Sequence, residues 1–171
     1  MSKAVVELLT KAHDRKGFDC GRLEQNEFLK QRARKHAELN YSKTWVAIED
    51  RFPRILGYVT LSMGNVVFDN LTEELRIRLP RYPMPVLHVG QLATDSSLQG
   101  RGIGSLLLRF AVEKAIEAAA TVGCFAIELI ADNPKAYDWY LKRGFSPLVA
   151  GSLRLYQSIE TLKIAAEQFD H

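Results

Sequence analysis

The sequence predicts an α/β fold in a single domain spanning residues 1–171, because strand patterns and helical patterns alternate along it. An apolar run over residues 86–94 is suited to a buried strand and is followed by turn residues and a long helical pattern. Two further strands, 44–49 and 55–62, flank a turn. A fourth, 124–130, leads into a helix. The chain has 171 residues, 47% hydrophobic and 25% charged, which suits one domain.

Composition narrows the class of protein. The formal charge of +3 permits an anionic partner without requiring one. Cys20 and Cys124 are the only cysteines, too few for a disulfide framework, and no metal site is expected. The N-terminus, Met1 to Ala4, lacks the apolar region of a signal peptide, and no apolar run is long enough to span a membrane. These features favour a cytoplasmic protein without membrane association.

The N-terminal half predicts short elements. Residues 4–9 form a short strand, and a turn over 18–21 leads into a helix from about Leu23 to Leu39. Residues 72–79 are a short helix or an irregular segment. Residues 80–85, with three prolines, are a stiff approach to the central strand.

Basic residues cluster on two of these segments. Lys30 and Arg34 share one face of the first predicted helix and Lys35 follows, whereas Arg76, Arg78 and Arg81 precede the central strand. Each group is either an ordinary solvated surface or a contact for an anionic partner.

The C-terminal part predicts a helix that begins at Asn133-Pro134 and is stopped by Gly144. Residues 147–149 and 153–156 complete the sheet. Residues 159–169 form a final helix that is a candidate interface element.

The junction after the central strand carries a glycine-rich loop. Asp95, Ser96 and Ser97 end the strand, and residues 99–104 (Gln-Gly-Arg-Gly-Ile-Gly) open the long helix. Glycines there permit positive φ and a close backbone approach, and a helix N-terminus attracts anions, so the junction is suited to phosphate. A turn that merely caps the helix is the alternative. The spacing matches neither a Walker A loop nor a dinucleotide-binding fingerprint.

This loop resembles the pyrophosphate loop of the GCN5-related N-acetyltransferases (GNAT). A second resemblance to that family is the pattern carried by Asn133, Ala136, Tyr140, Gly144 and Phe145, and a third is the hairpin over 44–62. The resemblance implies a central, mixed, mostly antiparallel sheet of about six to seven strands, flanked by helices and splayed at an acetyl-CoA cleft.

The resemblance also implies roles for individual residues. Acetyl-CoA would be bound by a set comprising Leu92, Ala93, Thr94, Gln99, Gly100, Arg101, Gly102, Ile103, Gly104 and Asn133. Within it, main-chain N–H groups near residues 92–94 would polarise the thioester carbonyl. Tyr140 would protonate the departing thiolate, although packing on an amphipathic helix is its alternative role.

No general base is evident. Glu128 is either a base or a half-exposed structural glutamate, and His88 is either a base or a hydrogen-bonded core residue. An amine of low pKa, such as that of an aminoacyl ester, would need no strong base.

Residues 18–21 (Phe-Asp-Cys-Gly), Pro83 to Leu87 and Leu92 to Asp95 look similar to the acetyltransferase toxins of type II toxin–antitoxin systems. This resemblance implies acetylation of the α-amine of aminoacyl-tRNA, inhibition of translation and a ribbon-helix-helix antitoxin as partner. A homodimer is a candidate assembly. The basic set, Lys30, Arg34, Lys35, Arg76, Arg78 and Arg81, would then contact tRNA phosphates. An ordinary acetyltransferase for a small amine or protein N-terminus, and a non-catalytic acyl-CoA-binding module, are the alternatives.

Overall fold

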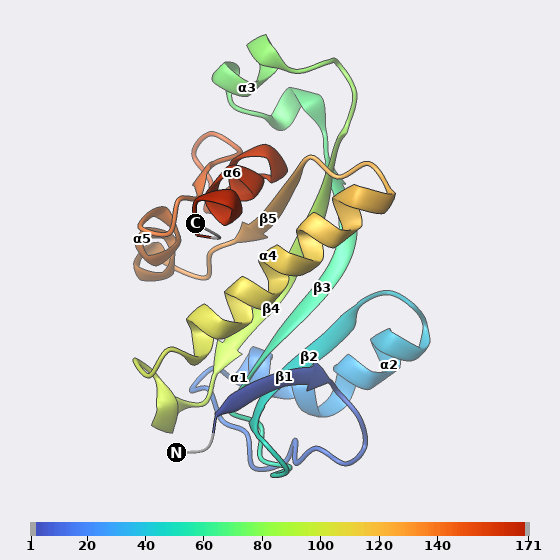
Figure 1. Cartoon of the computed structure of the whole chain (residues 1–171), viewed down its shortest axis with the longest axis vertical. Helices are drawn as coiled ribbons and strands as arrows, with labels where there is room; N and C mark the ends of the chain where they lie inside the picture. Colours follow the sequence, from blue (N-terminus) through green and yellow to red (C-terminus); the bar gives the residue numbers. More distant parts are fainter. Residues whose placement is uncertain (1–2, 170–171) are drawn as a thin grey trace. The chain divides into compact units, whose positions relative to one another are not determined.

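The computed structural model describes residues 3–169, and their strands form a seven-stranded sheet in the order β1-β2-β3-β4-β5-β7-β6 (Figure 1). The strands are β1 (Ala4–Leu8), β2 (Lys43–Glu49), β3 (Gly57–Val66), β4 (Met84–Thr94), β5 (Ala126–Ile130), β6 (Ser146–Pro147) and β7 (Arg154–Ser158). β4 and β5 are parallel, whereas β1–β2, β2–β3, β5–β7 and β6–β7 are antiparallel. This confirms the predicted mixed, mostly antiparallel sheet. Met1 and Ser2, which belong to the N-terminus predicted to lack a signal peptide, lie outside the described residues.

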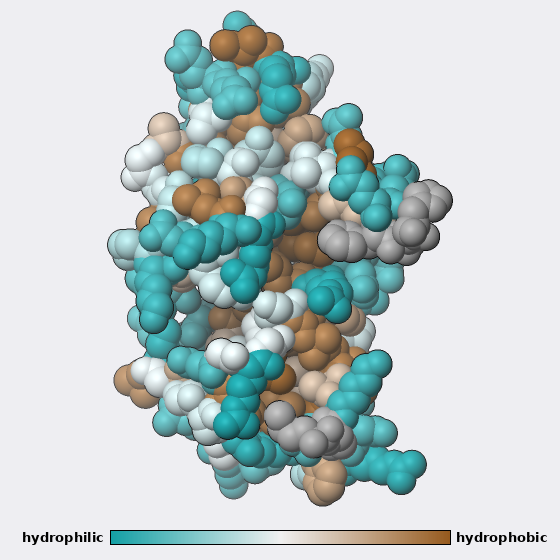
Figure 2. All heavy atoms as spheres, turned by 60° about the vertical axis from the view of Figure 1, so that its left-hand side comes forward, coloured by the Kyte–Doolittle hydropathy of each residue, from teal (hydrophilic) through white to brown (hydrophobic). Residues whose placement is uncertain are grey.

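Six α-helices lie within residues 3–169: α1 (Leu23–Glu27), α2 (Ala33–Glu38), α3 (Glu73–Arg78), α4 (Ile103–Thr121), α5 (Pro134–Leu141) and α6 (Ile159–Phe169). Shorter turns are the π-helical η1 (Phe28–Arg32) and the 3₁₀ turns η2 (Phe68–Asn70) and η3 (Ser96–Leu98). None of the described helices combines the length and apolar composition that crossing a membrane requires. Figure 2 shows one face of the molecule, on which hydrophilic residues lie among hydrophobic ones.

The single helix predicted over 23–39 is interrupted by the π-helical turn. Two consecutive residues of this turn, Phe28 and Leu29, are buried. The guanidinium of Arg15 donates to the backbone oxygen of Lys30 at 3.0 Å. An outside donor on a helix carbonyl loosens the regular hydrogen-bond ladder, so the wider turn has an identifiable cause.

The chain forms two compact units, each described by itself. The first comprises the residues up to Ser62 together with Gly90–Ala111. Its core is built around Tyr58, whose ring meets that of Phe18 edge-on at 5.6 Å and whose hydroxyl donates to the backbone oxygen of Gln25 at 2.7 Å. α2 lies beside β2 in this unit (Figure 1).

The second unit comprises Met63–Val89 and the residues from Val112 onward. At the end of α5, the N–H of Gly144 donates to Leu141 and that of Phe145 donates to Tyr140, both to backbone oxygens. Gly144 has φ +92°, and the Tyr140 and Phe145 rings are 5.5 Å apart. This is the Schellman arrangement, so the predicted helix stop at Gly144 is confirmed with its mechanism.

A buried carboxylate joins three strands of the second unit. Glu128 on β5 is 1% exposed. Its Oε2 lies 2.8 Å from Nδ1 of His88 on β4, and its Oε1 accepts from Nε of Arg154 on β7 at 2.9 Å. Burial opposes ionisation, but hydrogen bonds and charge from His88 and Arg154 outweigh it and hold the pKa of Glu128 below its usual value. The expected half-exposed position of Glu128 is therefore wrong, since three strands enclose it.

We predict that Glu128→Gln lowers the free energy of unfolding at neutral pH by about 3 kcal/mol, because it leaves Arg154 without its counter-ion. A folded pKa below the unfolded one stabilises the protein above the unfolded pKa, and that stabilisation is lost as pH falls through the folded pKa. The difference between wild type and variant should therefore shrink on acidification. Urea unfolding at neutral pH and below about pH 4 measures it.

The matched control is Glu117→Gln. Glu117 is exposed and pairs with Lys114 on the surface at 3.1 Å, so its removal should change stability by less than about 1 kcal/mol. A loss for Glu128→Gln that is the same at both pH values would contradict an ionised Glu128.

Candidate active site

The end of β4 is held by the buried carboxylate of Asp95. Its Oδ1 accepts from the Ser97 N–H at 3.0 Å and from the Ser97 hydroxyl at 2.7 Å, and its Oδ2 accepts from the Asp19 N–H at 3.3 Å. The N–H of Asp95 donates to the backbone oxygen of Leu56 at 2.9 Å. One residue therefore ties the strand end to η3, to the residue that precedes β3 and to the segment before α1.

Asp95 stays ionised in this position. Burial acts to raise its pKa, but hydrogen bonds from Ser97 and Asp19 and the charge of Arg54, 3.7 Å away, outweigh it and leave the pKa below its usual value. In the sequence Asp95 is recognisable only as a turn residue, and its anchoring role becomes visible in the structure. The available signal was the Asp-Ser-Ser order, which is typical of a side chain that accepts from the backbone N–H two residues on.

Two of the three loop glycines have the backbone geometry that the sequence predicted. Gly100 has φ +80° and Gly102 has φ +86°, and no heavy atom of another described residue lies within 4 Å of a Cβ built at either position. Gly104 instead lies inside α4, which begins one residue earlier at Ile103, and does not use the positive φ that glycine permits. The open space at Gly100 and Gly102, beside a helix N-terminus, fits an anionic group such as pyrophosphate.

A glycine outside the loop, Gly57 of β3, helps to position it. A Cβ built on Gly57 would lie 2.8 Å from the backbone oxygen of Ala93, 2.8 Å from Cγ2 of Ile103 and 3.0 Å from Cδ1 of Leu107. Only glycine permits such a close approach of β3 to both β4 and α4. In the sequence Gly57 is visible only as part of the hairpin over 44–62, because the residues that it contacts are far from it along the chain.

The residues predicted to polarise a carbonyl, Leu92, Ala93 and Thr94, form the C-terminal end of β4. Ala93 is buried, and Leu92 and Thr94 are half-buried. The parallel register with β5 covers Val86–Val89 and so ends before this segment begins. The segment leads directly into Asp95 and the glycine loop, so the first unit brings together all predicted cofactor-binding residues except Asn133.

Tyr140 lies on α5 in the second unit and is 8% exposed. Its ring packs edge-on against Trp139 at 5.0 Å and against Phe145 at 5.5 Å. Burial and then the negative charge of Asp132 raise its pKa well above the usual value, against a smaller opposing effect of Arg143. The hydroxyl is thus protonated at every physiological pH, as a proton donor requires, and the aromatic packing that was its alternative role is also present.

Asn133 shares the second unit with Tyr140, and its side chain caps α5. Its Oδ1 accepts from the backbone N–H of Ala136 at 2.8 Å. Its structural role is therefore visible, and the predicted cofactor contact of Asn133 stays a prediction.

The two candidate bases prove to be partners of each other. Because ionised Glu128 can only accept hydrogen bonds, the contact requires the proton on Nδ1 of His88, which leaves Nε2 of His88 as its basic nitrogen. Both oxygens of Glu128 are engaged, one by His88 and one by Arg154, which argues against its service as a base. The described residues contain no group of three or more His, Cys, Asp or Glu able to hold a metal ion.

The basic residues fall into one group in each unit. Lys30, Arg34 and Lys35 lie on η1 and α2 in the first unit. In the second unit, Arg76 and Arg78 lie exposed on α3, with Arg81 just beyond it. Exposed Tyr82 follows Arg81 directly. This juxtaposition of aromatic and basic side chains was missed in the sequence analysis and is suited to nucleic acid.

Comparison with known proteins agrees with this geometry. The family model described as the acetyltransferase (GNAT) family matches residues 3–145. The tRNA-acetylating toxin of Mycobacterium tuberculosis (strain ATCC 25618 / H37Rv) is 31% identical over 137 residues, 80% of this chain and 81% of that protein. AtaT complexed with acetyl-methionyl-tRNAfMet is 26% identical, with a TM-score of 0.87 over 96% of this chain and 99% of its own.

A tyrosine-to-phenylalanine mutant of AtaT, bound to the C-terminus of the antitoxin AtaR and to acetyl-CoA, is 25% identical to this chain. Its TM-score is 0.80, and the match covers 96% of this chain and 98% of that one. The family model and the mycobacterial relative each match most of the sequence. The chain therefore belongs to the acetyltransferase (GNAT) family.

Proposed function

We propose that this protein is an acetyl-CoA-dependent N-acetyltransferase that modifies the α-amine of the amino acid on charged tRNA, and that it acts as the toxin of a type II toxin–antitoxin system by blocking translation. The observation that carries the proposal is the Asp95-anchored loop, with Gly100 and Gly102 open at the N-terminus of α4. The choice of substrate is supported by the relatives, a tRNA-acetylating toxin and AtaT with acetyl-methionyl-tRNAfMet.

The loop residues, Gln99 to Gly104, hold the pyrophosphate of acetyl-CoA in this proposal. Bound acetyl-CoA supplies an acetyl group activated as a thioester. Main-chain N–H groups of Leu92 to Thr94 would donate to the thioester oxygen, where negative charge would develop during attack. Tyr140 would give its proton to the departing thiolate and would be reprotonated by the proton that the attacking amine releases as the amide forms. Its raised pKa means that the hydroxyl is protonated before the reaction begins.

The acceptor amine explains why no dedicated base is required. An ester withdraws electrons from the α-amine of an aminoacyl-tRNA, so a large fraction of that amine is already neutral and nucleophilic at physiological pH. In this proposal Glu128 stabilises the sheet through His88 and Arg154 and takes no part in the reaction.

Partners and location follow from the same proposal. The toxin is neutralised by a small ribbon-helix-helix antitoxin that also binds operator DNA. AtaT bound to the C-terminus of its antitoxin is the related arrangement. Charged tRNA and operator DNA are both cytoplasmic, so the protein acts in the cytoplasm. Residues 1–171 act as one N-acetyltransferase domain, which can pair as a homodimer.

We predict that Gly102→Glu abolishes acetyl-CoA binding in a folded protein. The new side chain enters the open space of the loop, and its carboxylate repels pyrophosphate. Isothermal titration calorimetry should show the affinity reduced by tenfold or more, corresponding to at least about 1.4 kcal/mol. Gly151→Glu is the matched control, because Gly151 also has a positive φ (+70°) and open space around it but lies far from the loop in the sequence. Wild-type affinity in folded Gly102→Glu would exclude the loop as the binding site.

Tyr140→Phe should remove most turnover, about 10²-fold or more, and leave acetyl-CoA affinity nearly intact, since only the hydroxyl is lost. Steady-state kinetics combined with calorimetry separate the two quantities. Tyr137→Phe, a half-buried tyrosine on the same helix, should keep its turnover. If Tyr140→Phe turned over as fast as wild type, Tyr140 would have only a packing role.

The substrate is tested by incubating the protein with acetyl-CoA and purified aminoacyl-tRNA, followed by mass spectrometry of the released amino acid. We expect N-acetylated amino acid, and the double variant Arg76→Glu/Arg78→Glu should lower its yield without affecting acetyl-CoA binding. The affinity for tRNA should fall with salt, with a logarithmic slope of about −0.7 to −0.9 per phosphate contact.

Lys142→Glu/Lys163→Glu is the control for this double variant, because it makes the same change in net charge at exposed lysines outside the proposed set. Rapid acetylation of a small free amine, with no acetylation of any charged tRNA, would replace the proposal by an ordinary small-molecule acetyltransferase.

A further inference from the structure

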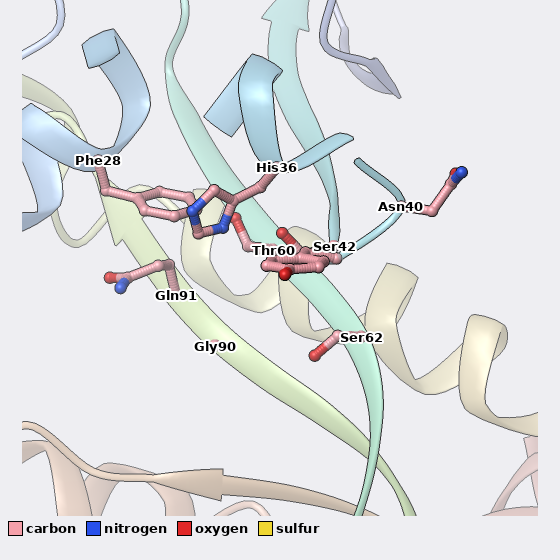
Figure 3. Close-up of a pocket in the computed structure, with 9 residues that line it drawn as sticks. Phe28, His36, Asn40, Ser42, Thr60, Ser62, Gly90 and Gln91 are labelled. Atoms are coloured by element: carbon pink, nitrogen blue, oxygen red, sulfur yellow. The ribbon is translucent and has the colours of Figure 1, made fainter. Parts of the chain in front are cut away.

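A cavity of about 580 Å³ lies in the first unit. Its lining includes Phe28, His36, Tyr41 and Ser42 from the N-terminal part of the chain, and Gly90 and Gln91 from β4 (Figure 3). Ligand pockets for drug-sized molecules measure about 300–1,000 Å³, so this cavity has room for much more than an amine.

The cavity adjoins the proposed reaction centre along the chain itself. Gly90 and Gln91 on its wall directly precede Leu92, the first of the residues proposed to polarise the thioester. A molecule in this cavity therefore lies beside the strand segment at which acetyl transfer would take place. Its position is that of the acceptor substrate, since the loop proposed for acetyl-CoA begins beyond the other end of that segment.

One wall of the cavity is a row of three rings. The imidazole of His36 meets Phe28 edge-on, with ring centroids 5.4 Å apart, and meets Tyr41 at 5.9 Å and 73°. Figure 3 shows the imidazole of His36 beside the Phe28 ring, with the Asn40 amide directed away from both. Tyr41, at the outer end of the row, is 70% exposed. An exposed aromatic ring that is held by a neighbour is suited to stacking on a nucleobase.

The segment that presents Tyr41 is rigidly built. The N–H of Asn40 donates to Ala37 and that of Tyr41 donates to His36, both to backbone oxygens, and Asn40 has φ +58°. This is a Schellman end of α2, with asparagine in the left-handed position. The Lys43 ammonium adds hydrogen bonds to the Ala37 oxygen at 2.9 Å and the Asn40 side chain at 3.1 Å.

The hydroxyl of Ser42, in the same segment, is buried and has no hydrogen-bond partner among the described residues. Thr60, also on the cavity wall, differs because its hydroxyl pairs with that of Thr44 at 2.8 Å. A buried hydroxyl without a partner is destabilising. The free hydrogen-bonding capacity of Ser42 is therefore a feature that a polar ligand would satisfy.

We infer that this cavity binds the 3′-terminal aminoacyl-nucleoside of the charged tRNA, with its base stacked on Tyr41 and a polar group hydrogen-bonded to Ser42. This inference rests on the proposed function and names the part of the substrate that the cavity recognises. It explains how a protein with a small net charge distinguishes an aminoacyl-tRNA from a free amine. The aromatic row and Ser42 bind the nucleoside, while the basic residues contact phosphates in other parts of the tRNA.

The test compares three acceptors that carry the same amino acid: charged tRNA, 3′-aminoacyl-adenosine and the amino acid methyl ester. For each acceptor, kcat/KM is measured in the full-length wild type, Tyr41→Leu and Ser42→Ala. We expect wild type to prefer both nucleoside-bearing acceptors over the methyl ester. Tyr41→Leu should reduce that preference about tenfold for tRNA and for aminoacyl-adenosine alike.

Ser42→Ala should also reduce the preference, yet the variant should be as stable as wild type or more stable, because it removes an unpaired buried hydroxyl. Phe52→Leu is the control: Phe52 is an exposed aromatic residue of the same unit that does not line the cavity, and its replacement should leave all three acceptors unaffected.

The inference would be overturned if Tyr41→Leu and Ser42→Ala lowered kcat/KM equally for all three acceptors, or did not lower it for the two nucleoside-bearing ones. In either case, acetylation of charged tRNA by the wild type would still support the proposed function. Failure of wild type to acetylate charged tRNA would overturn the proposed function itself and, with it, the inference.

Discussion

The ionised carboxylate of Asp95 is the constraint on which the rest of the candidate site depends. A carboxylate that is almost fully buried stays charged only where donors surround it, and here the donors come from Ser97 and Asp19, assisted by the charge of Arg54. These contacts fix where β4 ends, and the end of β4 fixes where the glycine loop and α4 begin. The open space at Gly100 and Gly102 is a consequence of that fixed start.

Three buried polar groups differ in their hydrogen-bond partners, and this difference distinguishes groups that stabilise the fold from a group that is available to a ligand. Glu128 is fully compensated, by His88 and Arg154, and so stabilises the sheet. Asp95 is compensated mostly by backbone and hydroxyl groups, and so shapes a loop. Ser42 is not compensated by any described residue. Its hydrogen-bonding capacity is therefore open to a polar ligand in the cavity.

Two helix ends show how the same local geometry serves different purposes. At the end of α5, Gly144 in the left-handed conformation returns Phe145 onto Tyr140 and holds the predicted proton donor within an aromatic cluster. At the end of α2, Asn40 occupies the equivalent position and presents Tyr41 to solvent beside the cavity. Both ends are Schellman motifs, and in both the motif fixes the position of the aromatic residue that follows it.

The sequence by itself determined the features that depend on neighbours along the chain. The strand–loop–helix order around residues 99–104, the helix stop at Gly144 and the alternation of strands and helices could be predicted, because turn chemistry and hydrophobic periodicity act over a few residues. Only the tertiary structure decided the rest. The tight contacts of Gly57, the partners of Glu128 and the unpaired hydroxyl of Ser42 depend on residues brought together from distant parts of the sequence. Burial and hydrogen-bond pairing arise from packing in three dimensions, and no local pattern encodes which distant groups will meet.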